Sequence, residues 1–190
     1  MKTMSFVKRA VALAVVSAAA TGASAMTSTT YELGVITFGA PTPFHGSNIG
    51  AADTFADTFK FTLPANGGSG YSVIDFPLSI PGLGDFKTLF SGMALYSAGG
   101  NGEPGGGDDT FLKGVTGTDS GSLSMTFDPS ASGRYFLDVF GRTDGTLGGI
   151  YNGAISITPV PEPESYAMLL AGLGVMGAIA VRRNKGKKQG

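Results

Sequence analysis

Residues 55–63 read FADTFKFTL. Apolar and polar side chains alternate through most of this stretch: Phe59, Phe61 and Leu63 are separated by Thr58, Lys60 and Thr62. Successive side chains of a β-strand point to opposite faces, so a period of two predicts a strand with one face in a hydrophobic core. The same period places Phe55, Asp57 and Phe59 on one face. A carboxylate between two core phenylalanines needs partners for its oxygens.

The alternation recurs along the chain between residues 26 and 158. It marks seven short runs, at residues 31–35, 59–63, 74–80, 89–97, 123–127, 135–139 and 151–157. Turn residues cluster between the runs, notably from Gly39 to Ala52, and Asp144-Gly145 is a hairpin signal. We therefore predict one all-β domain over residues 26–158. It would be a β-sandwich or jelly-roll-like pair of sheets with about seven or eight antiparallel strands.

The composition agrees with a β-rich exported domain. The chain has 31 glycines, 13 phenylalanines and 6 tyrosines, which favours many short strands and tight turns. It has no cysteine, which excludes disulfides, thiolate nucleophiles and cysteine-ligated metal sites. All 14 acidic residues lie between Glu32 and Glu164 with only five basic ones, so this span has a net charge of −9. Phosphates would be repelled by so acidic a body, which argues against nucleic acid as a partner.

Residues 1–25 are typical of a secretory signal peptide. Three basic residues accompany the start of an apolar run, AVALAVVSAAA at residues 10–20, which is short for a membrane span. The small residues Ala23 and Ala25 fit the −3 and −1 positions of a cleavage site. We expect a signal-peptide helix that signal peptidase removes before Met26. An uncleaved N-terminal anchor is the alternative.

The tail, residues 159–190, has three parts in a fixed order. Val160, Pro161, Glu162 and Pro163 form an extended element, because proline fixes φ and disfavours helix before it. Residues 165–181 carry no charge and would form a helix about 25 Å long, against a bilayer core of roughly 30 Å. The basic segment 182–190 follows, led by Arg182 and Arg183, whose side chains can reach the interface. We predict a transmembrane helix over 165–181, with the basic end in the cytoplasm and the body outside.

This tail resembles the PEP-CTERM sorting signal. The matching parts are the Pro-Glu-Pro element, the arginine pair and the apolar residues Leu169, Leu170, Gly172, Leu173 and Gly174. The resemblance implies processing by an exosortase, a membrane-embedded, cysteine transpeptidase-like enzyme of Gram-negative bacteria that make extracellular polysaccharide. It implies a precursor anchored in the inner membrane, cut near residues 161–163, and delivered to the cell surface or the extracellular matrix. An ordinary single-pass anchor is the alternative.

The body resembles the FxDxF family of PEP-CTERM proteins through Phe55, Asp57 and Phe59. Residues 136–140, FLDVF, repeat the spacing. The family name describes a pattern, so this resemblance implies no activity. From the residues themselves, we expect Asp57 to be a strand-entry or turn carboxylate that accepts backbone N–H bonds. A cation ligand is the alternative.

A glycine-rich loop at residues 98–109 holds oxygen ligands of the kind calcium prefers: Asn101, Glu103, Asp108 and Asp109. Their spacing matches no EF-hand or nonapeptide repeat, so a solvated acidic loop is the main interpretation and a calcium site the alternative. No other metal or cofactor is expected. His45 is the only histidine and no GxSxG elbow is present, so we assign no catalytic residue.

These observations favour a noncatalytic, exosortase-sorted protein of the cell surface and polysaccharide matrix. A carbohydrate-binding module is the second hypothesis, and it calls for an exposed aromatic platform. A secreted hydrolase is the third, and it calls for a cleft with convergent carboxylates.

Overall fold

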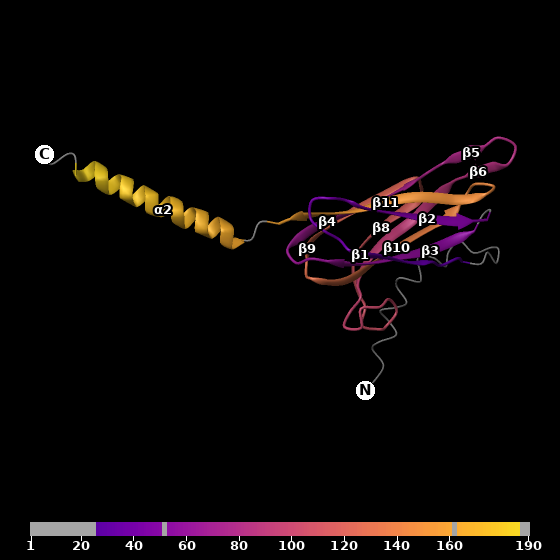
Figure 1. Cartoon of the computed structure of the whole chain (residues 1–190), viewed down its shortest axis with the longest axis horizontal. Helices are drawn as coiled ribbons and strands as arrows, with labels where there is room; N and C mark the ends of the chain where they lie inside the picture. The colour runs from indigo at the N-terminus through magenta and orange to yellow at the C-terminus, as the bar shows by residue number, and fades with distance from the viewer. Residues whose placement is uncertain (1–25, 51–52, 161–162, 187–190) are drawn as a thin grey trace, which may run out of the picture.

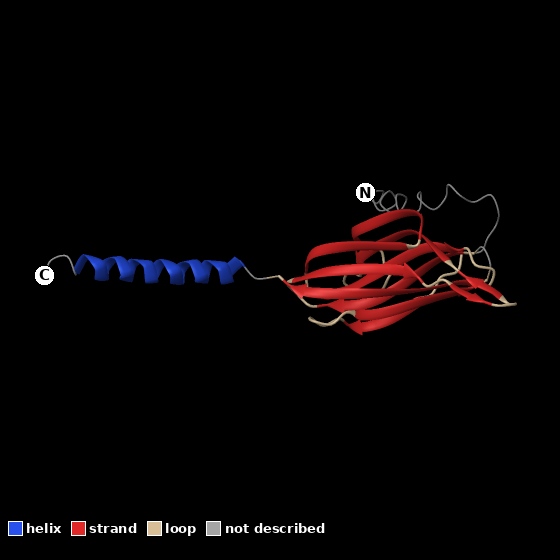
Figure 2. Ribbon diagram, turned by 90° about the horizontal axis from the view of Figure 1, so that it is seen from above, coloured by secondary structure: helices blue, strands red, loops and turns tan. Residues whose placement is uncertain are grey.

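The computed structural model describes residues 26–50, 53–160 and 163–186. The described residues form an all-β body followed by one helix (Figures 1 and 2). One sheet has five strands in the order β1 (Thr30–Val35), β3 (Thr54–Leu63), β10 (Gly133–Thr143), β7 (Thr88–Ser97) and β8 (Thr110–Ser120). The other has four, in the order β2 (Thr42–Ile49), β11 (Gly148–Pro159), β4 (Gly67–Asp75) and β9 (Ser122–Ser130). A small hairpin consists of β5 (Leu78–Ile80) and β6 (Gly84–Phe86).

Strand β3 has the alternation that its sequence predicts. From Phe55 to Leu63 every second side chain is buried, and the residues between them are partly exposed. The strand lies between β1 and β10 in the five-stranded sheet, so both of its edges are paired, and its inward face packs against the other sheet, as Phe59 does against Phe44. The predicted all-β class is confirmed.

The hydrophobic core lies where the inner faces of the two sheets meet. Its largest fully buried side chains come from both sheets: Tyr71, Tyr151, Phe55, Phe59, Phe90, Ile36, Leu63, Met93, Leu95, Leu137, Ile155 and Val73. Two rings pack flat on glycines of the paired strand. Tyr151 covers Gly46 and Phe44 covers Gly153, and a Cβ at either glycine would overlap the ring. Glycine is therefore required at these two positions by close packing rather than by its backbone freedom.

Four expectations about the strands are wrong. The described residues contain eleven strands rather than seven or eight, and β1 pairs with β3 in parallel. The turn-rich stretch contains β2, whose inward positions are Phe44, Gly46 and Asn48 and so lack a hydrophobic pattern. In the run at residues 74–80 the side chains predicted to be buried point outward, with Ile74 59% exposed, because β4 begins at Gly67 and buries Tyr71 and Val73 instead. Long β8 carried too few apolar residues to be predicted.

The helix α2 spans Pro163–Gly186 and extends away from the end of β11 (Figure 1). A helix is thus confirmed over the apolar part of the tail. Among the residues that the structure describes, no helix is long and apolar enough to cross a membrane, so the predicted transmembrane helix is not confirmed. The signal peptide and its Ala23 and Ala25 lie outside the described residues.

Candidate functional site

The sorting tail begins where the hydrogen bonding of the body ends. The last paired residue of β11 is Pro159, which lies opposite Gly67 of β4. The next residue, Val160, donates its N–H to the Asn66 carbonyl at 3.0 Å. Pro161 and Glu162 lie outside the described residues, and α2 starts at Pro163.

The helix presents its apolar residues to solvent. Every side chain from position 166 to 177 is exposed, including those of Leu169, Leu170 and Leu173, which are 60–68% exposed. Gly172 and Gly174 lie on the same helix, and a Cβ at either would meet nothing within 4 Å. Arg182 and Arg183 lie in its last turns, with side chains outside the description. The roles of these residues in sorting remain predictions.

Asp57 joins the two sheets from inside the core. It is fully buried, between buried Phe55 and Phe59, on the inward face of β3. Its Oδ2 accepts hydrogen bonds from Tyr151 Oη at 2.7 Å and from Asn48 Nδ2 at 3.1 Å, both on the opposite sheet. Its Oδ1 is buried and has no hydrogen-bond partner among the described residues.

The environment of Asp57 is that of a structural carboxyl group. Burial raises its pKa, while the bonds from Tyr151 and Asn48 act in the lowering direction. Burial also raises the pKa of Tyr151, and the neighbouring Asp57 adds to this. Side-chain donors from two strands of the opposite sheet thus bind this carboxylate, and a backbone hydrogen bond from Thr29 also acts to lower its pKa. The described residues hold no cluster of three or more His, Cys, Asp or Glu that could bind a metal.

The four candidate calcium ligands point to different partners. Asp108 Oδ2 accepts the backbone N–H groups of Gly100 at 2.7 Å and Asn101 at 3.2 Å. Asn101 Oδ1 accepts the N–H of Glu103 at 2.8 Å, and Asp109 Oδ2 accepts that of Gly105 at 2.6 Å. These bonds hold the loop in shape, as the solvated-loop interpretation expects.

Glu103 is turned toward the five-stranded sheet rather than into the loop. Its Oε2 lies 2.8 Å from Lys60 Nζ, which also pairs with Glu32. Lys60 and Arg134 hold the pKa of Glu103 below its usual range, with the hydrogen bond from Lys60 as the largest cause. A cavity of about 200 Å³ beside these charges is lined by both glutamates, Lys60 and Arg134 among others. Its carboxylates are thus bound to cations, whereas a general acid needs a raised pKa.

A second carboxyl group that sequence reasoning did not single out lies on the outer face of the same sheet. Asp138 of β10 accepts a hydrogen bond from Thr58 Oγ1 at 2.6 Å. Burial, with a further contribution from nearby Asp109, raises the pKa of Asp138 to about 6. Asp109 itself has a buried Oδ1 without a partner among the described residues. The only sequence signal was the repeated FxDxF spacing at 136–140.

Aromatic rings also gather on this outer face. Tyr96 and Phe136 stack with centroids 4.9 Å apart, and Phe111 packs edge-on to Tyr96 at 5.5 Å. Phe136 is buried and only Phe111 is largely exposed, at 59%. These three rings therefore do not make the open platform that the carbohydrate-binding hypothesis calls for.

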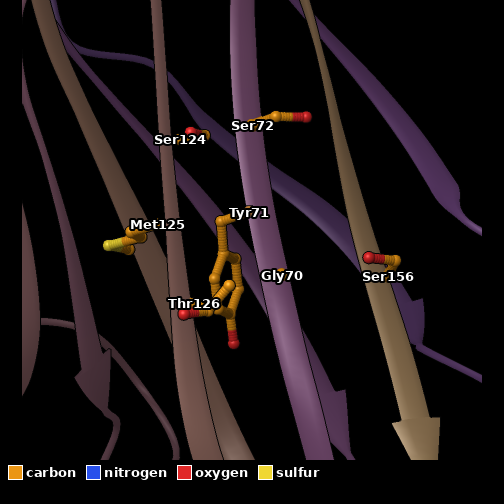
Figure 3. A pocket seen from close by; sticks show the side chains of 7 residues that line it. All are labelled: Gly70, Tyr71, Ser72, Ser124, Met125, Thr126 and Ser156. Carbon is orange, nitrogen blue, oxygen red and sulfur yellow. The ribbon is translucent and has the colours of Figure 1, made fainter.

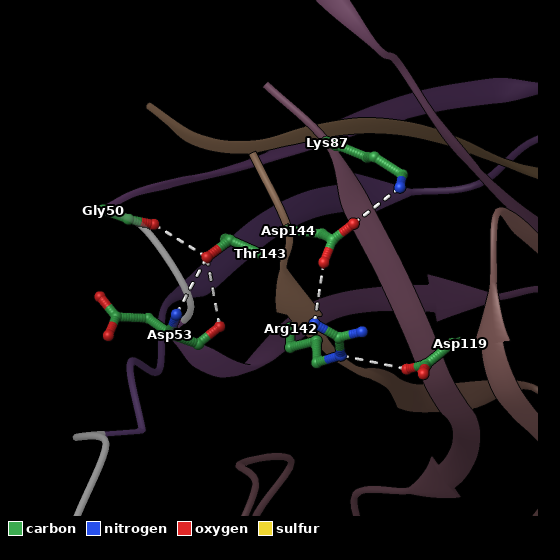
Figure 4. A network of polar contacts seen from close by, with 7 residues as sticks. All are labelled: Gly50, Asp53, Lys87, Asp119, Arg142, Thr143 and Asp144. Atoms are coloured by element: carbon green, nitrogen blue, oxygen red, sulfur yellow. Dashed lines mark hydrogen bonds and ion pairs between the residues drawn. The ribbon is translucent and has the colours of Figure 1, made fainter. Parts of the chain in front are cut away.

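One polar network holds the turn between β10 and β11 (Figure 4). The hairpin expected at Asp144-Gly145 is wrong, because β10 and β11 belong to different sheets and the chain crosses from one sheet to the other here. Arg142 donates to Asp119 Oδ1 at 3.1 Å and to Asp144 Oδ1 at 3.0 Å, and Lys87 lies 2.7 Å from Asp144 Oδ2. Buried Thr143 donates to the Gly50 carbonyl at 2.8 Å. The network ties this turn to neighbouring strands, so we interpret it as structural.

The outer face of the four-stranded sheet carries a groove of about 410 Å³ (Figure 3). Its floor is β4 at Gly70, and its lining comes from β4, β9 and β11: Gly70, Tyr71, Ser72, Ser124, Met125, Thr126 and Ser156. None of these residues is charged. His45 is exposed on the same sheet, on β2, and is not among the lining residues.

Comparison with known proteins bears on the tail. The family described as the PEP-CTERM protein-sorting motif matches residues 159–184. The chain therefore carries this sorting motif, which implies an exported, surface-directed protein with a C-terminal anchor and an exosortase as its processing partner. No curated protein sequence matches the chain.

Several solved structures resemble the body weakly. The pre-peptidase C-terminal domain of a Bacillus anthracis collagenase is 17% identical with a TM-score of 0.40, over 68% of this chain and 94% of that chain. PliG, a periplasmic inhibitor of g-type lysozyme from Aeromonas hydrophila, is 19% identical with a TM-score of 0.34, over 70% and 100%. The surface-associated copper-binding protein CorA of Methylomicrobium album BG8 is 10% identical with a TM-score of 0.36, over 73% and 100%. The sorting motif is thus the comparison that bears on function.

Proposed function

We propose that this chain is a noncatalytic protein of the outer surface or extracellular matrix of a Gram-negative bacterium, associated with its exopolysaccharide. In this proposal an exosortase cuts the tail near residues 161–163 and releases a β-sandwich body of the FxDxF type. The observation that carries the proposal is the position of the motif. The last ladder pair and the Val160 hydrogen bond precede the Pro-Glu-Pro element, so removal of the tail leaves every strand of the body intact.

The bonding partners of the carboxylates support a noncatalytic body. Asp57 is used between the sheets, Glu103 is bound to Lys60, and Asp108 and Asp109 accept loop amides. Hydrolysis of a glycosidic bond needs two carboxyl groups facing one cleft with pKa values set apart. In the cavity lined by Glu32 and Glu103 both carboxylates pair with Lys60, and the groove on the four-stranded sheet is lined by no carboxylate.

A carbohydrate-binding role is the second candidate, and the uncharged groove on the four-stranded sheet favours it. Its lining hydroxyls can exchange hydrogen bonds with a polyhydroxylated ligand without an aromatic platform.

The sorting proposal is tested by mass spectrometry of the protein in its native cells, with and without the exosortase. We expect the peptide containing Leu169 and Leu170 to be lost from the surface form only when the enzyme is present. A Pro161→Ala/Pro163→Ala variant should keep that peptide in both strains, and Ser165→Ala should behave as wild type. A C-terminus at Gly190 in both strains for the wild-type chain would overturn the proposal.

A further inference from the structure

The groove follows the axis of β4 because this strand lacks an outer side chain where its neighbours have one. Gly70 lies opposite Ser156 of β11 and Thr126 of β9. One step along, Ser72 lies opposite Ser124. The result is a shallow trough above Gly70, with Ser124 and Thr126 on the β9 side, Ser156 on the β11 side and Ser72 on β4 itself (Figure 3). At its other end, the Asp128 carboxylate and the Thr158 hydroxyl occupy the space above Gly68.

The hydroxyl groups of the trough differ from those that the body uses for its own hydrogen bonds. Hydroxyls near the turns and sheet edges bond to the protein itself, as Thr143 does to Gly50 and Thr146 to Asp85. For Ser72, Ser124, Thr126 and Ser156, no side-chain hydrogen bond to any described residue is found. These four groups face outward on three adjacent strands, so their donors and acceptors are free for a ligand.

The chemistry of the lining narrows the class of ligand. No charged residue lines the trough, which disfavours phosphorylated or sulfated ligands because nothing there would balance their charge. Its apolar residues, Tyr71 and Met125, are more than nine-tenths buried, which leaves little for a lipid chain to contact. The floor strand β4 is paired on both sides, and the free edge of β9 is the one away from β4, so a peptide that added to the sheet there would not lie in the trough. A hydroxyl-rich, uncharged chain has the donors and acceptors that match.

We propose that this trough binds one extended chain of a neutral polysaccharide, lying along β4 and bonded by the hydroxyls of β9 and β11. The volume of about 410 Å³ is within the usual range of small-ligand sites. This inference rests on the proposed placement of the protein in a polysaccharide matrix and names the chemical class of its partner there.

Two variants alter the trough in different ways. Gly70→Val fills it, and the new Cβ would lie 3.1 Å from Ser156 Oγ, a side-chain atom that can rotate away. Valine also suits a strand, so the fold should persist. The triple variant Ser124→Ala/Thr126→Val/Ser156→Ala removes the three hydroxyls of β9 and β11 and leaves the floor open. Ser47→Val, an exposed change on β2 of the same sheet, is the matched control.

The test is electrophoresis of the full chain in native gels containing hydroxyethylcellulose, dextran or laminarin, with alginate as an anionic comparison. Thermal melting of each variant checks that it is folded. We expect at least one neutral polymer to retard the wild type and Ser47→Val alike. The triple variant should bind about tenfold more weakly, as the loss of one or two hydrogen bonds implies. Gly70→Val should weaken binding at least as much, because it fills the space that the ligand would occupy.

Three results would overturn the inference: no retardation by any of the three neutral polymers, unchanged retardation of Gly70→Val, or stronger retardation by alginate than by all of them. Because purified chain is used, these results do not depend on the exosortase. A negative result in the polysaccharide-binding test can therefore be distinguished from a negative result in the test of sorting.

Discussion

Replacing Asp138 by asparagine should remove a pH-dependent loss of stability. In the folded protein, burial and the neighbouring Asp109 raise the pKa of this carboxyl group from 3.8 to about 6. Below about pH 3 the group is protonated in both the folded and the unfolded chain. As the pH rises toward 6, the unfolded chain releases the proton first, so the free energy of unfolding falls, and the loss is complete above the folded pKa.

The magnitude follows from the two pKa values. At about 1.36 kcal/mol per pKa unit, the difference between 3.8 and about 6 corresponds to about 3 kcal/mol. Water at the partly exposed side of the group reduces this, so we expect about 2 kcal/mol. Asparagine stays neutral and can still accept the bond from Thr58. Asp138→Asn should therefore equal the wild type in stability near pH 3 and exceed it by about 2 kcal/mol near pH 7.5.

Urea unfolding at a series of pH values measures this difference. Tyrosine fluorescence can follow it, because the chain has six tyrosines and no tryptophan. Asp128→Asn, at an exposed position on the opposite sheet, is the control and should not reproduce the effect. Comparison with the wild type at each pH cancels the contributions of other groups, including buried Asp57. A stability difference between Asp138→Asn and wild type that stays constant from pH 3 to 7.5 would refute the reasoning.

Three further predictions concern the body and its loop. Asp57→Ala leaves two buried donors without an acceptor and should lower the free energy of unfolding by about 2–5 kcal/mol; a loss below about 1 kcal/mol in urea unfolding would contradict the cross-sheet role. Lys60→Met frees Glu103 and should speed amide exchange in loop 98–109 several-fold, while global stability changes by less than about 1 kcal/mol because the glutamates are exposed; unchanged exchange would show that this ion pair does not hold the loop. A chain ending at Val160 should melt within about 2 °C of the full chain, whereas one ending at Ile155 should lose several degrees; equal melting of the two truncations would contradict the boundary.

Local signals predicted much of the fold. The alternation from Phe59 to Leu63 identified β3 and its buried face, and similar patterns identified β7, β9, β10 and β11. The pattern failed where tertiary neighbours replace hydrophobic side chains. In β2 the inward Gly46 is covered by Tyr151 from the next strand, so no apolar residue is needed there and none is visible in the sequence.

The candidate sites also fall into two groups: one that contiguous residues predict, and one that depends on tertiary contacts. The sorting tail is read from contiguous residues, and the family comparison agrees with it over 159–184. The calcium ligands were near in sequence, but the loop turns Glu103 to Lys60 and leaves Asp108 among its own amides. Sequence distance was a poor guide because each carboxylate bonds to the closest donor in space.

By itself, the sequence identified the sorting motif of the protein and the β character of its body, because a linear motif and a two-residue period depend only on neighbours along the chain. Only the tertiary structure decided which side chains of the body lie next to one another. It set Asp57 between Tyr151 and Asn48, brought Asp138 beside Asp109, and placed Gly70 between Thr126 and Ser156. Those partners lie on separate strands, and only sheet pairing and packing set which residues face one another.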